Sequence, residues 1–230
     1  MLYSVMRLLV QGFLRLYCRL RVVGLENVPG TGPALLASNH VSLLDPPAVG
    51  ATVRRPLDFL AKAELFRVPL LGGLVGRLNA HPVDREGADA GALRLALALL
   101  RKGRALLVFP EGTRGREGSL SPGRPGVGML AALAGVPVVP VYVRGTGRAL
   151  PRGAVVPRPV RVTVAYGPPI RFEKGRGRDR YQAVSDEIMA AIGRLKAEME
   201  RGDAPGPVPS ATRGHTDRTA RGPLAAGQLH

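Results

Sequence analysis

The sequence predicts an α/β fold, with a mixed, largely parallel central sheet flanked by helices in a single layered domain. Short apolar runs typical of buried strands alternate with longer segments that carry apolar residues at helical spacing. With 230 residues, of which 45% are hydrophobic, the chain can bury one substantial core. We therefore expect an N-terminal amphipathic helix over 1–20, one domain over 21–202 and a disordered, Pro/Gly-rich tail over 203–230.

The N-terminal segment is apolar but carries regularly spaced polar residues. Arg7, Gln11, Arg15 and Arg19 recur every four residues and so follow one stripe of a helix, while leucines and Phe13 occupy the rest of its circumference. Arginines within the run disfavour a membrane-spanning helix, and no signal-peptide cleavage site follows. We expect a helix that lies in a lipid interface; the alternative is a helix that only packs on the domain core.

Turn signals separate the remaining elements of the chain. Strands are expected over 20–23, 33–37, 57–62, 105–109, 136–143 and 160–165. Helices are expected from Pro46 onward and over 88–101, 127–134 and 179–201. A stretch broken by Pro and Gly runs from the third strand to Gly76, and no internal repeat is evident. The second strand leads into Ser38-Asn39-His40, so His40 is expected where a strand gives way to a loop.

The segment Asn39-His40-Val41-Ser42-Leu43-Leu44-Asp45 places a histidine five residues before a carboxylate. A neutral imidazole is a natural general base, and a carboxylate on its other nitrogen fixes the tautomer and stabilises the imidazolium. On a regular helix the two residues would lie about 140° apart, so they can meet only if a turn intervenes before Pro46. The alternative is that Asp45 serves only as a helix N-cap and that His40 is a buried loop histidine.

The segment Phe109-Pro110-Glu111-Gly112-Thr113-Arg114 follows an apolar strand. Gly112 allows close approach to the backbone, Thr113 supplies a hydroxyl and Arg114 offers a bidentate contact, so the loop could hold a phosphate. Glu111 is expected to anchor Arg114 or the loop backbone, because a carboxylate is an unfavourable neighbour for a phosphate. The alternative is a strand and turn with a surface arginine.

Together these segments resemble signature blocks of the glycerophospholipid acyltransferases of the lysophosphatidic acid acyltransferase type. Four blocks follow in the order of that family: His40 to Asp45, Val83-Asp84-Arg85, Phe109 to Arg114, and Val136-Pro137-Val138-Val139-Pro140-Val141. The resemblance covers about residues 20–170. It implies that His40 is the general base and that Asp45 orients it.

The resemblance also implies a phosphate-recognition site made by Arg85, Glu111, Gly112 and Arg114. Arg124 stands before Pro125-Gly126, where the family often places a basic residue; a solvated charge is the alternative. His81, near the second block, is expected to be a variable loop residue.

The implied activity is transfer of a fatty acyl group from acyl-CoA or acyl-carrier protein to the free hydroxyl of 1-acylglycerol-3-phosphate, giving phosphatidic acid. Glycerol 3-phosphate, another lysophospholipid or a lyso-aminolipid are alternative acceptors. The implied location is the cytoplasmic face of the cell membrane, as a peripheral or monotopic protein. No cofactor is expected, and no metal site, because the four histidines lack metal-ligand spacing and Cys18 is the single cysteine.

The charge balance points to an anionic partner. The formal net charge is +16, and the basic residues are mostly arginine, whose donor fork suits phosphate. The absence of Trp and the 4% aromatic content disfavour nucleic acid, which leaves an anionic membrane surface and a phosphorylated substrate as the expected partners. A non-catalytic protein that binds anionic lipid or nucleic acid is the alternative from a different functional class. The oligomeric state stays open.

Overall fold

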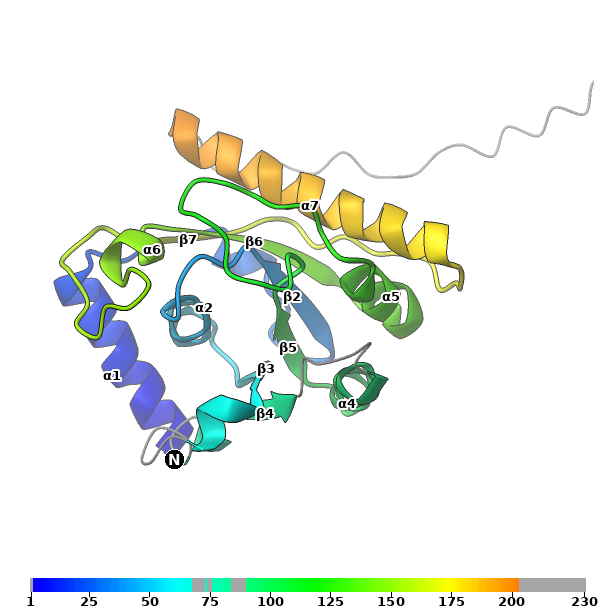
Figure 1. Cartoon of the computed structure of the whole chain (residues 1–230), viewed down its shortest axis with the longest axis horizontal. Coiled ribbons are helices and arrows are strands. Elements are labelled where there is room, and N and C mark those ends of the chain that lie inside the picture. The colour runs from blue at the N-terminus through cyan, green and yellow to red at the C-terminus, as the bar shows by residue number, and fades with distance from the viewer. Residues whose placement is uncertain (1, 68–72, 74–75, 84–89, 203–230) are drawn as a thin grey trace, which may run out of the picture.

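A seven-stranded sheet forms the centre of the computed structural model, which describes residues 2–67, 73, 76–83 and 90–202 (Figure 1). The strand order is β1-β7-β6-β2-β5-β3-β4. Among these strands, β6 and β7 pair antiparallel and the other neighbours pair parallel. The predicted α/β class with a mixed, largely parallel sheet is therefore confirmed.

The strands are short and most of the helices cover the sheet. The strands are β1 (Arg21–Val23), β2 (Ala34–Ser38), β3 (Leu57–Lys62), β4 (Ala80–Val83), β5 (Ala105–Val108), β6 (Val138–Arg144) and β7 (Thr163–Tyr166). The helices are α1 (Leu2–Tyr17), α2 (Asp45–Thr52), α4 (Ala90–Arg101), α5 (Pro125–Ala134), α6 (Thr146–Ala149) and α7 (Arg178–Arg201). Two 3-10 turns are also present, η1 (Leu25–Asn27) and η2 (Ala63–Arg67).

Two hydrophobic layers cover the two faces of the sheet. Leu36 of β2 packs in one core with Leu14 of α1 and Val49 of α2. Its neighbour Leu35 packs in the other core, with residues of α4, α5 and α7 such as Ile188. Successive side chains of a strand point to opposite faces, so a fully buried strand such as β2 reads as a continuous apolar run.

The parallel pairing of β2 and β5 determines where the polar segments meet. Ala37 of β2 is in register with Val108 of β5, so the two strands end side by side. The loop that begins after Ser38 and the loop that begins at Phe109 therefore leave the sheet at the same edge. In open α/β sheets this carboxyl edge is where ligands bind.

The predicted elements agree with the observed ones to within a few residues, but the short helix α6 was not predicted and one segment was assigned wrongly. The segment around His81 was expected to be a loop, but it forms the edge strand β4. Pro82 obscured it, although an edge strand tolerates proline because one side of its backbone needs no partner. His81 Nε2 lies 2.8 Å from Asp58 Oδ1, so the side chain is held by a buried carboxylate. The expected disordered tail over 203–230 lies outside the described residues.

The packing of α5 against α7 depends on Gly128. A Cβ atom at this position would lie 1.8 Å from the carbonyl oxygen of Tyr181 and 2.9 Å from the amide nitrogen of Ser185. Gly128→Ala should therefore lower the free energy of unfolding by about 1–3 kcal/mol, because the two helices must separate. Urea denaturation measures the change.

A matched control is present in the same helix. A Cβ at Gly126 meets nothing within 4 Å, and alanine favours a helix over glycine by up to about 1 kcal/mol. Gly126→Ala should leave the stability unchanged or raise it slightly. Equal stability of the two variants would contradict the close approach of α5 and α7.

Candidate active site

His40 and Asp45 meet at the carboxyl edge of the sheet. The distance between His40 Nδ1 and Asp45 Oδ2 is 2.8 Å, and the side chains are 10% and 0% exposed. A turn precedes α2, in which the amide of Asp45 donates to the carbonyl of Ser42 at 3.2 Å. This turn brings together two residues that a continuous helix would separate.

The Asp45 carboxylate points back into the loop before its own helix. Oδ2 also accepts hydrogen bonds from the amides of Val41, at 2.7 Å, and Ser42, at 2.8 Å. The N-cap of α2 is Leu44, so the alternative in which Asp45 serves only as a helix N-cap does not describe this geometry. Because a carboxylate can only accept, Nδ1 of His40 donates the proton in this hydrogen bond, and in the neutral imidazole Nε2 then has the lone pair. Such a histidine can take a proton from a substrate hydroxyl.

The loop after β5 makes three contacts with His40. The Phe109 ring stacks on the imidazole, with ring centroids 4.0 Å apart and an angle of 20° between the planes. The amide of Gly115 donates to the His40 carbonyl at 2.7 Å. The amide of His40 donates to Glu111 Oε1 at 3.1 Å. Backbone and ring are thus both fixed by the segment 109–115.

Glu111 acts as a link between backbone segments. The residue is 3% exposed, and its Oε2 accepts a hydrogen bond from the amide of Ser121 at 3.1 Å. Both carboxylate oxygens therefore bind backbone amides, one in each of two loops. Of the two anchoring roles expected for Glu111, the structure shows contact with the backbone.

Gly112 and Arg124 lie against each other. Gly112 has a φ of +69°, and a Cβ there would lie 2.7 Å from both Cδ and Nε of Arg124. Arg124 is the N-cap residue of α5. Its amide donates to the Pro110 carbonyl at 2.9 Å, which ties it to the loop that contains Gly112. The sequence separates these residues by twelve positions, but the structure brings the Arg124 side chain against Gly112.

Thr113 and Arg114 continue the same loop. Thr113 is exposed and Arg114 is half-buried. The carbonyl of Arg114 accepts a hydrogen bond from Arg152 Nη2. Arg85, the remaining predicted phosphate ligand, lies outside the described residues.

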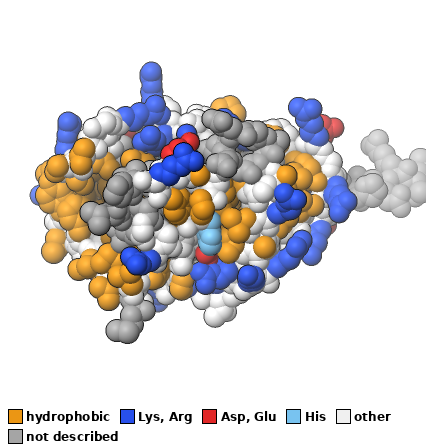
Figure 2. Space-filling view, turned by 60° about the horizontal axis from the view of Figure 1, so that its bottom comes forward, with side chains coloured by type: hydrophobic (Ala, Val, Ile, Leu, Met, Phe, Trp, Pro, Cys, Tyr) orange, Lys and Arg blue, Asp and Glu red, His pale blue; other side chains and the backbone are white. Residues whose placement is uncertain are grey.

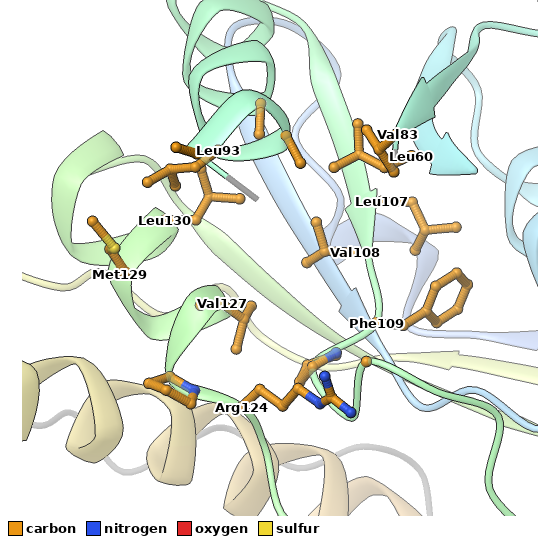
Figure 3. A pocket seen from close by; sticks show the side chains of 17 residues that line it. Leu60, Val83, Leu93, Leu107, Val108, Phe109, Arg124, Val127, Met129 and Leu130 are labelled. Carbon is orange, nitrogen blue, oxygen red and sulfur yellow. The ribbon is translucent and has the colours of Figure 1, made fainter. Parts of the chain in front are cut away.

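An apolar groove opens beside this site, which the sequence reasoning did not identify. Its volume is about 650 Å³, and Phe109, Gly112 and Arg124 lie along its wall (Figure 3). The rest of the wall comes from β3, β4, β5, α4 and α5, through residues such as Leu60, Val83, Leu93, Val108 and Leu130. The periodicity of the two helices predicted core packing only, because a groove depends on how far apart separate elements stand.

A family model described as Acyltransferase matches residues 19–144, which is more than half of the chain. The chain belongs to the Acyltransferase family. The matched region begins just after α1, ends with β6, and includes His40, Asp45, the segment 109–114 and Arg124. The suspected family is thereby confirmed.

Individual members of the family are similar to this chain. A chloroplastic 1-acyl-sn-glycerol-3-phosphate acyltransferase of Brassica napus is 34% identical over 136 residues, which are 58% of this chain and 39% of that protein. A 1-acyl-sn-glycerol-3-phosphate acyltransferase of Bacillus subtilis is 24% identical over 185 residues, which are 79% of this chain and 90% of that protein. The chain thus spans less than half the length of the plant relative.

A solved member of the family has the same fold. The crystal structure of the 1-acyl-sn-glycerophosphate acyltransferase of Thermotoga maritima matches with a TM-score of 0.69 and 29% identity. The match covers 85% of this chain and 80% of that chain, so the common architecture extends beyond the sheet itself.

Proposed function

We propose that the protein transfers a fatty acyl group from acyl-CoA or acyl-carrier protein to the free hydroxyl of 1-acylglycerol-3-phosphate, giving phosphatidic acid. The observation that carries the proposal is the His40–Asp45 pair, which lies beside the segment 109–114 in a member of the Acyltransferase family. The named activity of the relatives supports the choice of acceptor. No cofactor takes part.

In this mechanism His40 is the general base. Its Nε2 takes the proton from the acceptor hydroxyl while the oxygen attacks the thioester carbonyl of the donor. The Asp45 carboxylate stabilises the imidazolium that forms, because Oδ2 already accepts from Nδ1. When the tetrahedral intermediate collapses, the C–S bond breaks and the proton on Nε2 neutralises the departing thiolate. The products are the ester and the free thiol.

The phosphate of the acceptor would bind at the loop after β5. Gly112 leaves room for the Arg124 side chain, Thr113 adds a hydroxyl, and Arg114 and Arg124 add positive charge. Arg85 is assigned to the same site by the family resemblance. Glu111 contributes by holding the loop, because its two oxygens bind the amides of His40 and Ser121.

The apolar groove is suited to a fatty acyl chain. Pockets of roughly 300–1,000 Å³ with mostly apolar walls are typical of small-molecule sites, and this groove lies within that range at about 650 Å³. Because Phe109 lines the groove and stacks on His40, one end of an acyl chain in the groove would lie near His40, the proposed base. The depth of the groove would then limit the chain length that the enzyme accepts.

The proposed location is the cytoplasmic face of the cell membrane, with peripheral or monotopic attachment. Within the described part of the chain, none of the helices has the length and apolar character needed to span a membrane. The outer face of α1 carries exposed Leu9, Phe13 and Leu16, which supports attachment in the plane of the lipid interface.

Replacing Arg114 by Ala should raise KM for lysophosphatidic acid by about tenfold or more and change kcat little. The reason is that a hydrogen bond to a charged group is worth about 1.5–3 kcal/mol. The bond from Arg114 to the phosphate would be made equally in the bound substrate and in the transition state, so its loss affects KM and not kcat. Steady-state kinetics with varied acceptor measure the change. Arg116→Ala, at an exposed position two residues further on, is the control and should leave KM unchanged. An equal effect of both variants would contradict a specific role for Arg114.

The proposed activity is tested with purified protein, acyl-CoA and either lysophosphatidic acid or glycerol 3-phosphate, by following thiol release and lipid product. Product from lysophosphatidic acid alone supports the proposal. Product from glycerol 3-phosphate alone keeps the mechanism but changes the acceptor. If neither acceptor gives product, an acyl-carrier-protein donor and other lyso-lipid acceptors are tested next. If these also fail, and salt-sensitive lipid binding is unaffected by His40→Ala, the result favours a non-catalytic binding protein.

A further inference from the structure

The large apolar side chains that are exposed in the described residues are concentrated in three segments. Seven of them belong to α1, two are adjacent in the loop after α6, and one lies between His40 and Asp45. They are Leu2, Val5, Leu8, Leu9, Phe13, Leu16, Tyr17, Val155, Val156 and Leu43. Val155 and Val156 are 90% and 74% exposed, which is unusual for two adjacent β-branched residues at the tip of a loop.

The α1 residues form a stripe along one side of the helix. Leu2, Val5, Leu9, Phe13 and Leu16 follow steps of three and four residues. The opposite side packs on the core through Leu14, which is 0% exposed. Core packing and an exposed apolar face therefore occur together in α1. In Figure 2 hydrophobic side chains gather at the left end, the side on which α1 lies in Figure 1.

The loop 150–158 connects this stripe to the active site. The hydroxyl of Tyr17, at the end of α1, donates to the Pro157 carbonyl at 3.1 Å. At the other end of the loop, the hydroxyl of Ser42 donates to the Leu150 carbonyl at 2.9 Å. Arg152 donates to the Arg114 carbonyl between these points. One loop thus contacts α1, the His40–Asp45 loop and the loop of Arg114.

The charges of these segments indicate what covers the apolar surface. Segments 2–23 and 144–161 contain arginines and no acidic residue. The arginines are Arg7, Arg15, Arg19, Arg21, Arg144, Arg148, Arg152, Arg158 and Arg161. A second copy of this chain would bring a further set of like charges against the first, whereas an anionic bilayer offers both an apolar interior and negative head groups.

We infer that the loop 150–158 is a second lipid-contacting element, which inserts Val155 and Val156 into an anionic phospholipid surface beside α1. Two separate points of contact fix the orientation of the protein on the bilayer, which a single helix does not. Leu43, 53% exposed and three residues from His40, then faces the same surface. This inference deepens the proposed function, on which it rests for one consequence: a lysophospholipid reaches His40 directly from the bilayer.

The absence of Trp from the chain allows a direct test. Val155→Trp introduces a single fluorophore at the loop tip, and Ala183→Trp introduces one at an exposed position of α7. Phosphatidylcholine vesicles that contain phosphatidylglycerol are added to each variant without any acyl donor or acceptor. The emission at position 155 should shift to the blue and be quenched by brominated lipid, and that at position 183 should not.

A second pair of variants tests the contribution to binding. Val155→Asn with Val156→Asn should lower partitioning to these vesicles by about tenfold or more, because two apolar side chains no longer leave water. Ala183→Asn with Ala190→Asn, both exposed on α7, is the matched control and should bind like wild type. With a short-chain acceptor dispersed in water, turnover by the loop variant should equal that of wild type.

Either of two results would overturn the inference. One is an unshifted Val155→Trp emission on vesicles that the protein does bind. The other is a blue shift that follows protein concentration without lipid, which would mean that a second copy covers the loop. Both results are measured by binding alone. A failure of the proposed acyl transfer would be seen separately, as a lack of product both with acceptor in vesicles and with acceptor dispersed in water.

Discussion

Replacing His40 by Ala should lower kcat by about 10²- to 10⁴-fold, while the affinity for lysophosphatidic acid stays close to that of wild type. The variant loses the proposed general base, but it keeps the loop 109–115 and the groove. The Gly115 amide still binds the backbone carbonyl of residue 40. Thiol release under saturating substrates measures kcat, and binding of a non-reactive acceptor analogue measures affinity.

His81 provides a matched control for His40. Its Nε2 also lies 2.8 Å from a buried carboxylate, that of Asp58. However, the carboxylate that holds His81 lies near the beginning of its strand, β3, and is also bound by Arg104. His40, in contrast, follows the end of β2, at the carboxyl edge of the sheet. His81→Gln should therefore retain turnover. A comparable loss of kcat in both histidine variants, or activity retained by His40→Ala, would contradict the assignment of the base.

Replacing Asp45 by Asn should also lower kcat by about 10²- to 10⁴-fold. The amide is nearly the same size as the carboxylate, but it cannot stabilise a charged imidazolium. Oδ2 of Asp45 now accepts three hydrogen bonds, from His40, Val41 and Ser42. If the amide oxygen of the variant takes the place of Oδ2, it keeps the two backbone hydrogen bonds and its NH₂ group points away from His40. If the NH₂ group instead faces Nδ1, it donates to Nδ1 and so selects the wrong tautomer of the imidazole.

The double variant separates a shared role from two independent ones. If Asp45 acts only through His40, His40→Ala with Asp45→Asn should be no slower than His40→Ala alone. Losses that multiply would show that Asp45 has a separate function. Circular dichroism and thermal unfolding of each variant check that a loss of turnover does not come from unfolding.

The sequence predicted much of the fold because its elements carry their own periodicity. The apolar run of β2 and the helical spacing of α4 and α7 can be recognised without tertiary information. β4 could not be, because Pro82 looks like a break unless the strand is known to be at the edge of the sheet. The meeting of His40 and Asp45 was predictable only on the condition that a turn preceded Pro46.

The site was predictable where its residues are consecutive and much less so where they are assembled by the fold. The segment 109–114 is a continuous motif, and its glycine predicted a close approach to the backbone; the positive φ that Gly112 adopts was not predicted. The contact of Arg124 with Gly112 and the bond from Ser121 to Glu111 cross a loop, which spacing does not reveal. The groove depends on the separation of α4 and α5, which no local pattern encodes.

The position of Phe109 would link the binding of the donor chain to the alignment of His40. One ring is both a wall of the groove and the stacking partner of the imidazole. A donor chain that fills the groove presses on the ring that keeps His40 in place, and a chain that leaves the groove partly empty does not. The fit of the donor would then be transmitted to the alignment of the base, so that a poorly matched donor is penalised in the rate of the chemical step as well as in binding. The enzyme would then select the donor chain in the acyl-transfer step at His40, although the chain itself binds in the groove.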